Sequence, residues 1–298
     1  MTATWIDIAR KDFEDAVRSK MLWGFIGIFL AFVTISLFSA EQLFPASVTV
    51  DAPMALAGVA MLAQLFIPGI ALVAGYMAVV GERQSGSLRI LLSYPFSRFD
   101  IVLGKLAGRL LITGIGLSIG FAVASGLVVW LYGVPTVTQF MQFVATGILL
   151  GLSFTGLAVG GSAATKTRGS AMTLTIGSFM SMVFFWKPIV VGIYYGVKGT
   201  LPGIKADAWY FLLKRLNPLE AYRVLTGAAL NEPVDPVPKF PLEDIPANTP
   251  SEKLEIANRV VGEVPIYLDQ SMAVVIFIAW GTFPVILGYW RFKSEDLS

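Results

Sequence analysis

The side chains that could carry catalysis are scarce in this sequence of 298 residues. It contains no histidine and no cysteine, so it lacks the commonest general acid and base, the commonest metal ligand and the thiolate nucleophile. A histidine-bound haem, a zinc hydrolase and a Ser-His nucleophile pair are therefore excluded. We expect a chain that catalyses no reaction itself and binds no cofactor or metal ion.

One stretch approaches the spacing of a phosphate-binding loop, in which a glycine-rich backbone and a lysine cradle phosphates. Residues 160–167 read Gly-Gly-Ser-Ala-Ala-Thr-Lys-Thr. Thr165 stands where the motif needs its second glycine, and the stretch ends an apolar segment instead of following a strand. We therefore interpret Lys166 and Arg168 as basic anchors at a membrane surface.

The most informative spacing lies in a hydrophilic stretch, 81–98, between two long apolar runs. Gly81 and Gly86 allow tight backbone turns, three leucines recur at i, i+3 and i+4 as on one side of a short helix, and a proline ends that helix. Ser97, with Asp100 three residues later, predicts a capping box for the next helix. The region 81–105 is therefore predicted to be a helix–break–helix elbow that docks a partner and transmits its movement. The residues assigned to docking are Glu82, Arg83, Ser85, Gly86, Leu88, Arg89, Leu91, Leu92, Pro95 and Arg98.

The elements that must hold this elbow are membrane spans. Charged residues make up 14% of the chain and hydrophobic residues 55%, whereas a soluble domain carries about 25% charged residues; the mean hydropathy is +0.71. A spanning helix needs about 20 mostly apolar residues, and the sequence predicts an all-α, polytopic integral membrane protein with six transmembrane helices. The predicted spans are 21–38, 54–80, two within 110–164 separated by Gly133-Val134-Pro135, one that begins with 170–186, and 271–290.

The basic residues predict the orientation. Thirteen lysines and arginines fall in the segments on one side of the membrane, whereas the opposite short loops, 39–53 and 132–139, contain none. Because basic residues favour the cytoplasmic side, we expect a multi-pass protein of the cell membrane with both termini in the cytoplasm.

The remaining segments are predicted to lie outside the bilayer. Residues 1–20 show apolar residues at helical spacing with charges opposite, which predicts an amphipathic helix along the cytoplasmic surface. The five helices of 21–197 precede an external segment, 198–270, and the sixth helix, 271–290, precedes a short cytoplasmic tail, 291–298. Within the external segment we expect residues 208–230 to lie at the outer membrane surface, a proline-rich extended connector over 231–250 and a short surface helix over 251–264.

The motifs of the chain resemble those of one known family. Glu82-Arg83-x-Ser85-Gly86-Ser87-Leu88-x-x-Leu91-Leu92-Ser93-x-Pro95-x-Ser97-Arg98, followed by Gly104-Lys105, resembles the loop after the second span in permeases of the ABC type-2 exporter family. The element Asn217-Pro218-Leu219-Glu220-Ala221-Tyr222-Arg223 and the tail 289–297 resemble further family features. The resemblance covers essentially the whole chain, and the most similar branch is the one linked to maturation of a copper enzyme, nitrous oxide reductase.

The resemblance implies a permease subunit driven by a separate ABC ATPase, which would bind ATP and Mg²⁺. It implies that Glu82 and Arg83 pair with that partner or with the N-terminal helix, that the leucines enter a groove on the ATPase, and that Arg89 and Arg98 make charged contacts. A second permease, identical or similar, and membrane lipid are the other expected partners; no nucleic acid is expected. We expect an apolar or large substrate, because the sequence shows no conspicuous charged cavity.

Two questions stay open at the level of sequence. Glycines four residues apart let helices approach closely, and they could pack helices within one chain or between two; these are Gly104, Gly108, Gly116, Gly120, Gly147 and Gly151. The alternative functions are a stand-alone secondary transporter or channel, which would normally show charged residues or matched broken helices within the membrane, and a membrane assembly factor without transport.

Overall fold

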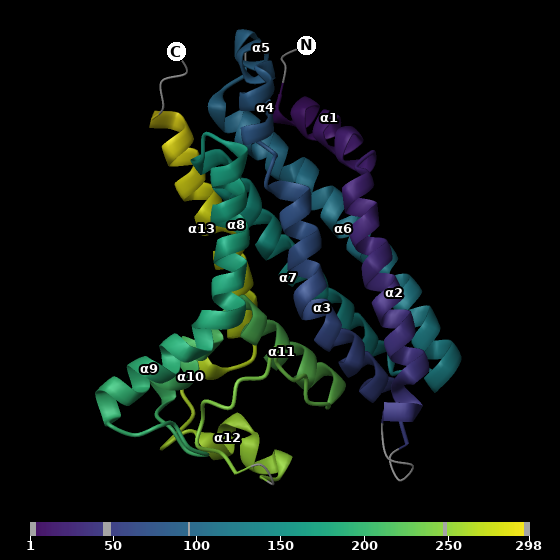
Figure 1. Ribbon diagram of the computed structural model, residues 1–298, viewed down its shortest axis with the longest axis vertical. Helices are drawn as coiled ribbons and strands as arrows, with labels where there is room; N and C mark the ends of the chain where they lie inside the picture. The colour runs from purple at the N-terminus through teal and green to yellow at the C-terminus, as the bar shows by residue number, and fades with distance from the viewer. Residues whose placement is uncertain (1–3, 44–48, 95, 247–248, 295–298) are drawn as a thin grey trace.

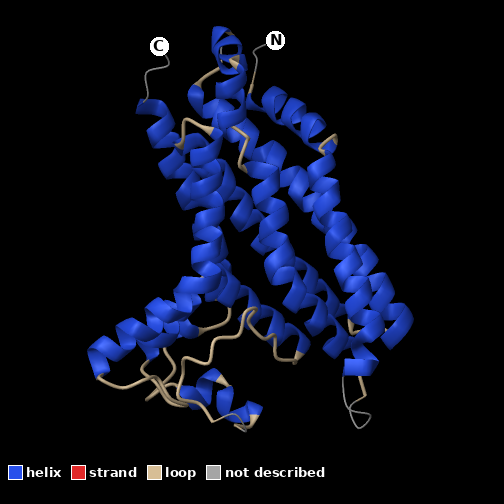
Figure 2. Cartoon of the chain, viewed as in Figure 1, coloured by secondary structure: helices blue, strands red, loops and turns tan. Residues whose placement is uncertain are grey.

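The computed structural model describes residues 4–43, 49–94, 96–246 and 249–294. All the regular elements in this part of the chain are helices (Figure 2), which confirms the predicted all-α class. Six helical segments are long and apolar enough to cross a membrane, as the composition predicts for a polytopic membrane protein. They are Lys20–Ser39, Ala52–Ser85, Arg98–Tyr132, Val137–Ala164, Arg168–Lys198 and Met272–Ser294.

The long helices form a bundle around α7 (Figure 1). The bundle helices are α2 (Lys20–Leu43), α3 (Ala52–Gly75), α6 (Arg98–Tyr132), α7 (Val137–Ala164), α8 (Arg168–Met180) and α13 (Met272–Ser294). One end of the bundle, here called the elbow end, carries α1 (Trp5–Val17), α4 (Val80–Ser85), α5 (Ser87–Ser93) and the last turn of α13. The opposite end, the lobe end, carries α9 (Trp186–Lys198), α10 (Ala208–Arg215), α11 (Pro218–Leu230) and α12 (Ile256–Arg259).

Small residues let the bundle helices touch backbone to backbone. A Cβ atom added to Gly156 or Gly160 of α7 would overlap the backbone of α13 at Gly281 and Pro284. The predicted glycine pairs also lie at helix contacts within this chain. Those of α6 lie against α1 and α2, and those of α7 lie against side chains of α6. Close approach increases the van der Waals contact that holds helices together in lipid, where apolar association gains little from the exclusion of water.

The fifth span continues further than its uncharged residues predict. A π-helical turn, Ser181–Phe185, joins α8 to α9 without a break, and α9 leaves the direction of α8 sideways (Figure 1). A π turn inserts an extra residue and is a known cause of a sharp bend. Pro188 follows the π turn as the third residue of α9 and has no N–H to continue the helical ladder, so it adds to the bend.

The segment between the last two spans folds into a small lobe. Helices α10 and α11 lie within the stretch expected to rest at the membrane surface, and the described part of 231–250 has no regular structure. The single surface helix expected over 251–264 is absent; a 3₁₀ turn, Ser251–Leu254, and the one-turn helix α12 take its place.

The glycine contact between α7 and α13 yields a direct test. Gly160→Leu should lower the free energy of unfolding by about 1 to 3 kcal/mol, because its side chain would be forced into the backbone of α13. Gly126→Leu, on α6 with nothing within 4 Å of its added Cβ, is the matched control and should have little effect. Unfolding in mixed micelles measures both, and equal stability of the two variants would contradict the packing.

Candidate functional site

In the region of the predicted elbow, the structure forms two short helices that meet at a sharp turn. Helix α4 ends and α5 begins at Gly86, whose φ of +78° lies in the left-handed region, where glycine is favoured because it lacks a Cβ. Gly81 lies inside α4 and makes no turn of its own. Ser97 starts α6 by accepting a hydrogen bond from the N–H of Asp100 at 3.1 Å, while Asp100 accepts one from the N–H of Ser97 at 2.9 Å.

Leu88 faces into the chain, which changes the role assigned to it. Its side chain is only 3% exposed and packs in an apolar cluster with residues of α1, α6 and α7. Leu91 is partly buried against the same cluster. Leu88 is therefore an anchor of the elbow and does not offer its side chain to a partner's groove in this structure. The side chains of Arg89 and Leu92, and Pro95 as a whole, lie outside the described residues.

Two predicted docking arginines fasten the elbow to the end of α13. The guanidinium groups of Arg83 and Arg98 lie 5.5 and 5.6 Å from the ring centroid of Phe292, which is completely buried. Arg98 also donates to the carbonyl oxygens of Phe292 and Lys293 at 2.6 and 3.0 Å. These contacts satisfy carbonyls that the last helical turn leaves without partners. Arg83 donates to the carbonyl of Thr165, at 2.7 Å, so it also ties the elbow to α7.

A buried ionic network joins the elbow to α1 and α6. The Lys105 ammonium lies 2.8 Å from Oδ1 of Asp12 and 2.7 Å from Oε1 of Glu82. Arg109 pairs with the other oxygen of Asp12 at 2.7 Å and donates to the carbonyl of Ala74 at 2.7 Å. Asp12 and Lys105 are 1% and 4% exposed. Two acids and two bases therefore balance in a region that water barely reaches, and Glu82 reaches the N-terminal helix through Lys105.

The seat of α1 on α6 depends on two glycines that flank Lys105 by one and three residues. A Cβ atom on Gly104 would lie 2.7 Å from the carbonyl oxygen of Trp5, and one on Gly108 would lie 2.8 Å from that of Ala9. Larger residues would hold α1 away from α6 and separate Asp12 from Lys105. The first glycine pair of the sequence therefore serves the ionic network.

The near match to a phosphate-binding loop is the end of a membrane helix. Its first residues, Gly160 and Gly161, are covered by α13 and α8, and the hydroxyl of Ser162 accepts hydrogen bonds from the N–H groups of Val79 and Val80 at 3.0 and 3.1 Å. Those contacts give partners to two backbone N–H groups at the break between α3 and α4. Residues 160–162 therefore pack against neighbouring helices and support the elbow.

The exposed part of the elbow is its tip. Gln84, Ser85, Gly86 and Ser93 are exposed, and the Tyr94 side chain is 58% exposed. The Ser85 hydroxyl lies 2.8 Å from that of Ser87, which also bonds to the Glu82 carboxylate. The elbow thus presents a small polar and aromatic surface on a base fixed by buried contacts.

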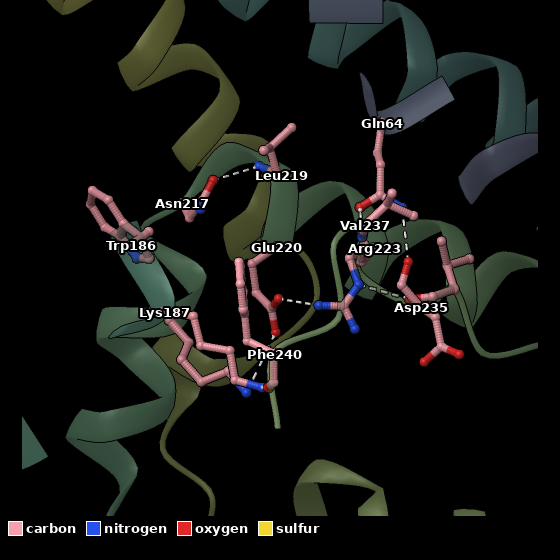
Figure 3. Close-up of polar contacts among 12 residues, drawn as sticks. Gln64, Trp186, Lys187, Asn217, Leu219, Glu220, Arg223, Asp235, Val237 and Phe240 are labelled. Carbon is pink, nitrogen blue, oxygen red and sulfur yellow. Dashed lines mark hydrogen bonds and ion pairs between the residues drawn. The ribbon is translucent and has the colours of Figure 1, made fainter. Parts of the chain in front are cut away.

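At the lobe end, polar side chains tie the lobe to the spans (Figure 3). Gln64 of α3, only 2% exposed, donates to the carbonyl of Asp235 at 2.8 Å and accepts from the N–H of Val237 at 3.4 Å. Lys187 donates to the carbonyl of Phe240 at 2.8 Å. Asn217 caps α11 through the N–H of Leu219 at 2.9 Å and donates to the carbonyl of Met182, in the π turn, at 2.8 Å.

Glu243 is the centre of the charges within the lobe. It lies 2.7 Å from the Lys214 ammonium and 3.4 Å from the Arg259 guanidinium, and it accepts a hydrogen bond from the Tyr210 hydroxyl. Burial alone would raise the pKa of Glu243, but the ammonium groups of Lys214 and Lys187 and the hydrogen bonds from Lys214 and Tyr210 hold it at about 2. The carboxylate therefore stays ionised and paired at neutral pH.

The bundle, the elbow and the lobe together define a helical protein with six candidate membrane spans. The sequence model of the family described as "ABC-2 family transporter protein" matches residues 6–297. The chain therefore belongs to the ABC-2 transporter family, as its motifs predict.

Two relatives agree with this assignment. The probable ABC transporter permease protein NosY of Pseudomonas aeruginosa is 32% identical over 232 residues, which cover 76% of this chain and 82% of that protein. The probable ABC transporter permease protein NosY of Stutzerimonas stutzeri is 29% identical over 240 residues, which cover 76% and 81%. The names of these two relatives belong to the same branch of the family that the sequence resembles most.

The ionic network can be tested by removing its central cation. Lys105→Met should destabilise the protein by about 3 to 5 kcal/mol, because it leaves Asp12 and Glu82 without their shared partner in a buried site. Lys11→Met, which removes an exposed lysine from α1, should have little effect. Unfolding in mixed micelles measures the difference, and a loss under 1 kcal/mol for Lys105→Met would mean that the network does not hold α1.

The lobe should lose stability in acid because of Glu243. The folded-state pKa of about 2 lies below the ordinary value of 4.5, so its stabilisation is complete above pH 4.5 and is lost as the pH falls toward 2. Glu243→Gln should therefore cost on the order of 3 kcal/mol at pH 7, and its difference from the wild type should shrink toward pH 2. Glu255→Gln, at an exposed position of the lobe, is the control; a difference independent of pH would contradict the ionic role of Glu243.

Proposed function

We propose that this protein is the membrane-spanning permease subunit of an ABC transporter. Transport would be driven by a separate ATPase that docks on the tip of the elbow. The observation that carries this proposal is the construction of the elbow. Its tip is exposed, whereas its base is fixed to three other segments through Leu88, the pair Arg83 and Arg98, and the Glu82–Lys105 ion pair. An exposed tip on a base that is fixed by buried contacts suits a segment that binds a partner and transmits the partner's movement to the spans.

The contacts of the base indicate where a push would go. Small packed helices move as rigid units, and the elbow is joined to α6 in sequence, to α1 through Lys105, and to α13 through Phe292. Because α4 is also the end of the second span, Ala52–Ser85, a displacement of the tip would reach the first, second, third and sixth spans together. That distribution supports alternating access by movement of whole helices.

Orientation and assembly complete the proposal. The elbow end would face the cytoplasm, since it carries the excess of lysine and arginine and since an ATPase can reach only that side. ATP and Mg²⁺ would bind the partner chain, and this chain would hydrolyse nothing. Two copies, or this chain and a similar one, would form the pathway between them, and its substrate would be apolar or large.

The alternative functions rest on weaker support. A secondary transporter would be expected to keep charges near the middle of the membrane, whereas the buried network of Asp12, Glu82, Lys105 and Arg109 lies at the elbow end beside α1. An assembly factor without transport would also use a docked partner, and measurement of transport separates the two. The similarity to proteins named NosY favours an ABC permease role over either alternative.

Docking on the tip predicts a selective loss of binding. Tyr94→Asp should reduce retention of a co-expressed ABC ATPase subunit at least tenfold during affinity purification of the permease in detergent, because it places a charge on the exposed aromatic residue of the tip. Ile266→Asp, at an 87% exposed position of the lobe, is the control for an exposed apolar-to-charged change and should retain the ATPase. Each variant should elute as the wild type does in size-exclusion chromatography.

The same experiment separates the alternatives. If the wild type retains the ATPase and Tyr94→Asp does too, the tip is not the docking surface. If the wild type retains no ATPase under conditions in which a known ABC permease retains its own, the proposed function itself is wrong.

A further inference from the structure

An apolar groove runs along the outside of the bundle between α8 and α13. Both helices rest on α7, and between them remains a groove of about 650 Å³, a size typical of ligand sites. Its floor is formed by the small residues Gly160, Gly161 and Ala164 of α7. A second hollow of about 460 Å³ continues it toward α9, since both are lined by Leu174, Ser178 and Trp280.

The walls of the groove suit a hydrocarbon chain. The α13 wall is Phe283, Leu287 and Trp290, which are between 45 and 63% exposed. The one hydroxyl in the middle of the groove, that of Ser178, already donates to the carbonyl of Leu174 at 2.6 Å. Trp280 is fixed at the far end of the groove by a hydrogen bond from its indole N–H to the carbonyl of Leu216 at 2.8 Å. Among the described residues that line the middle of the groove, no side chain therefore offers a free polar group to water or to a polar substrate.

The length of the groove corresponds to one leaflet. The eleven helical steps from Trp280 to Arg291 span roughly 16 Å at 1.5 Å per step. The hydrocarbon core of a bilayer is about 30 Å thick, so the groove is about as long as one acyl chain in the leaflet on the elbow side.

The elbow end of the groove carries positive charge. Arg291 and Ser294 line it there, and none of the described residues that line the groove is acidic. Within the part of the chain that the structure describes, no carboxylate pairs with Arg291. Basic pockets between spans at the level of the headgroups attract anionic lipids. Apolar burial offers little preference for one lipid over another, because a chain that leaves the bilayer for the groove exchanges one apolar environment for another; selectivity must come from this charge.

We propose that the groove between α8 and α13 binds one anionic glycerophospholipid of the leaflet on the elbow side. An acyl chain lies over the glycine floor from Arg291 toward Trp280, and the phosphate pairs with the guanidinium of Arg291. The bound lipid fills the space between the fifth and sixth spans. It does not depend on an ATPase, so it stands apart from the proposed function.

Native mass spectrometry of the purified protein in an equimolar mixture of phosphatidylglycerol and phosphatidylcholine tests the proposal. The wild type should retain phosphatidylglycerol about fivefold better than phosphatidylcholine, the preference expected for one basic residue near the membrane surface. Arg291→Gln should abolish this preference. Lys293→Gln, which removes an exposed lysine of the same helix end outside the groove, should keep it.

Two further variants separate the possible occupants. Ser178→Phe, which fills the place where the two hollows meet, should lose both lipids, whereas Ile176→Phe, on the same helix outside the groove, should retain them. Because the chain has no cysteine, Ser178→Cys reports on a second copy through disulfide formation.

Each result has a defined meaning. Equal lipid preference in Arg291→Gln and Lys293→Gln would overturn the proposal, and so would a disulfide-linked dimer at position 178, which would assign the groove to a second copy. If Ser178→Phe fails to fold, the pair Arg291→Gln and Lys293→Gln still decides, since both positions are exposed.

Discussion

The architecture of the elbow end depends on the need to neutralise one buried cation. Lys105 is 4% exposed, and an ammonium so far from water is stable only with partners close by. Its partners come from two different segments, Asp12 of α1 and Glu82 of α4, and Arg109 balances the remaining charge of Asp12. The pairing therefore sets the register of an amphipathic helix and of the elbow against the third span at the same time. An apolar contact could slide by a turn at small cost, but an ion pair in a dry site cannot.

The surroundings of this network follow from the same requirement. Helix α1 must approach α6 closely enough for Asp12 to reach Lys105, which explains why Gly104 and Gly108 stand on the face that α1 covers. The apolar cluster around Leu88 and Phe292 then excludes water from one side of the elbow. The arginines on Phe292 use the ring face and the terminal carbonyls of α13 together, so they contribute both cation–π and hydrogen-bond contacts.

The sequence predicted what depends on local rules and missed what depends on partners far along the chain. The spans follow from the length of the apolar runs. The turn at Gly86 and the cap at Ser97 follow from the properties of neighbouring residues, so all three features could be located in advance. The stripe of Leu88 and Leu91 indicated that one face of α5 is covered, but a stripe does not say whether the covering surface is in the same chain. Asp12 was the missed signal, since it sits among the buried residues of α1, on the side of Ala9 and Ala16. An acid on an apolar face predicts a buried cation elsewhere, although no spacing rule identifies that cation as Lys105, 93 residues away.

The two ends of the bundle are tied to the spans by different kinds of contact, and this difference determines how movement could pass between them. At the elbow end, ion pairs reach α1 and α6, and arginine contacts with the Phe292 ring and carbonyl reach α13. At the lobe end, Gln64 and Asn217 bind backbone atoms of the lobe and of the π turn. Helix α7 lies between these sets, in backbone contact with α13 through its glycines. A rotation of α13 imposed at Phe292 would therefore pass along this helix, past its glycine contact with α7, to Trp280. The indole N–H of Trp280 donates to the carbonyl of Leu216, beside the start of α11. The sixth span is held at Phe292 and at Trp280 and packs on the central helix by backbone contact, so it is the element best placed to couple the elbow to the lobe.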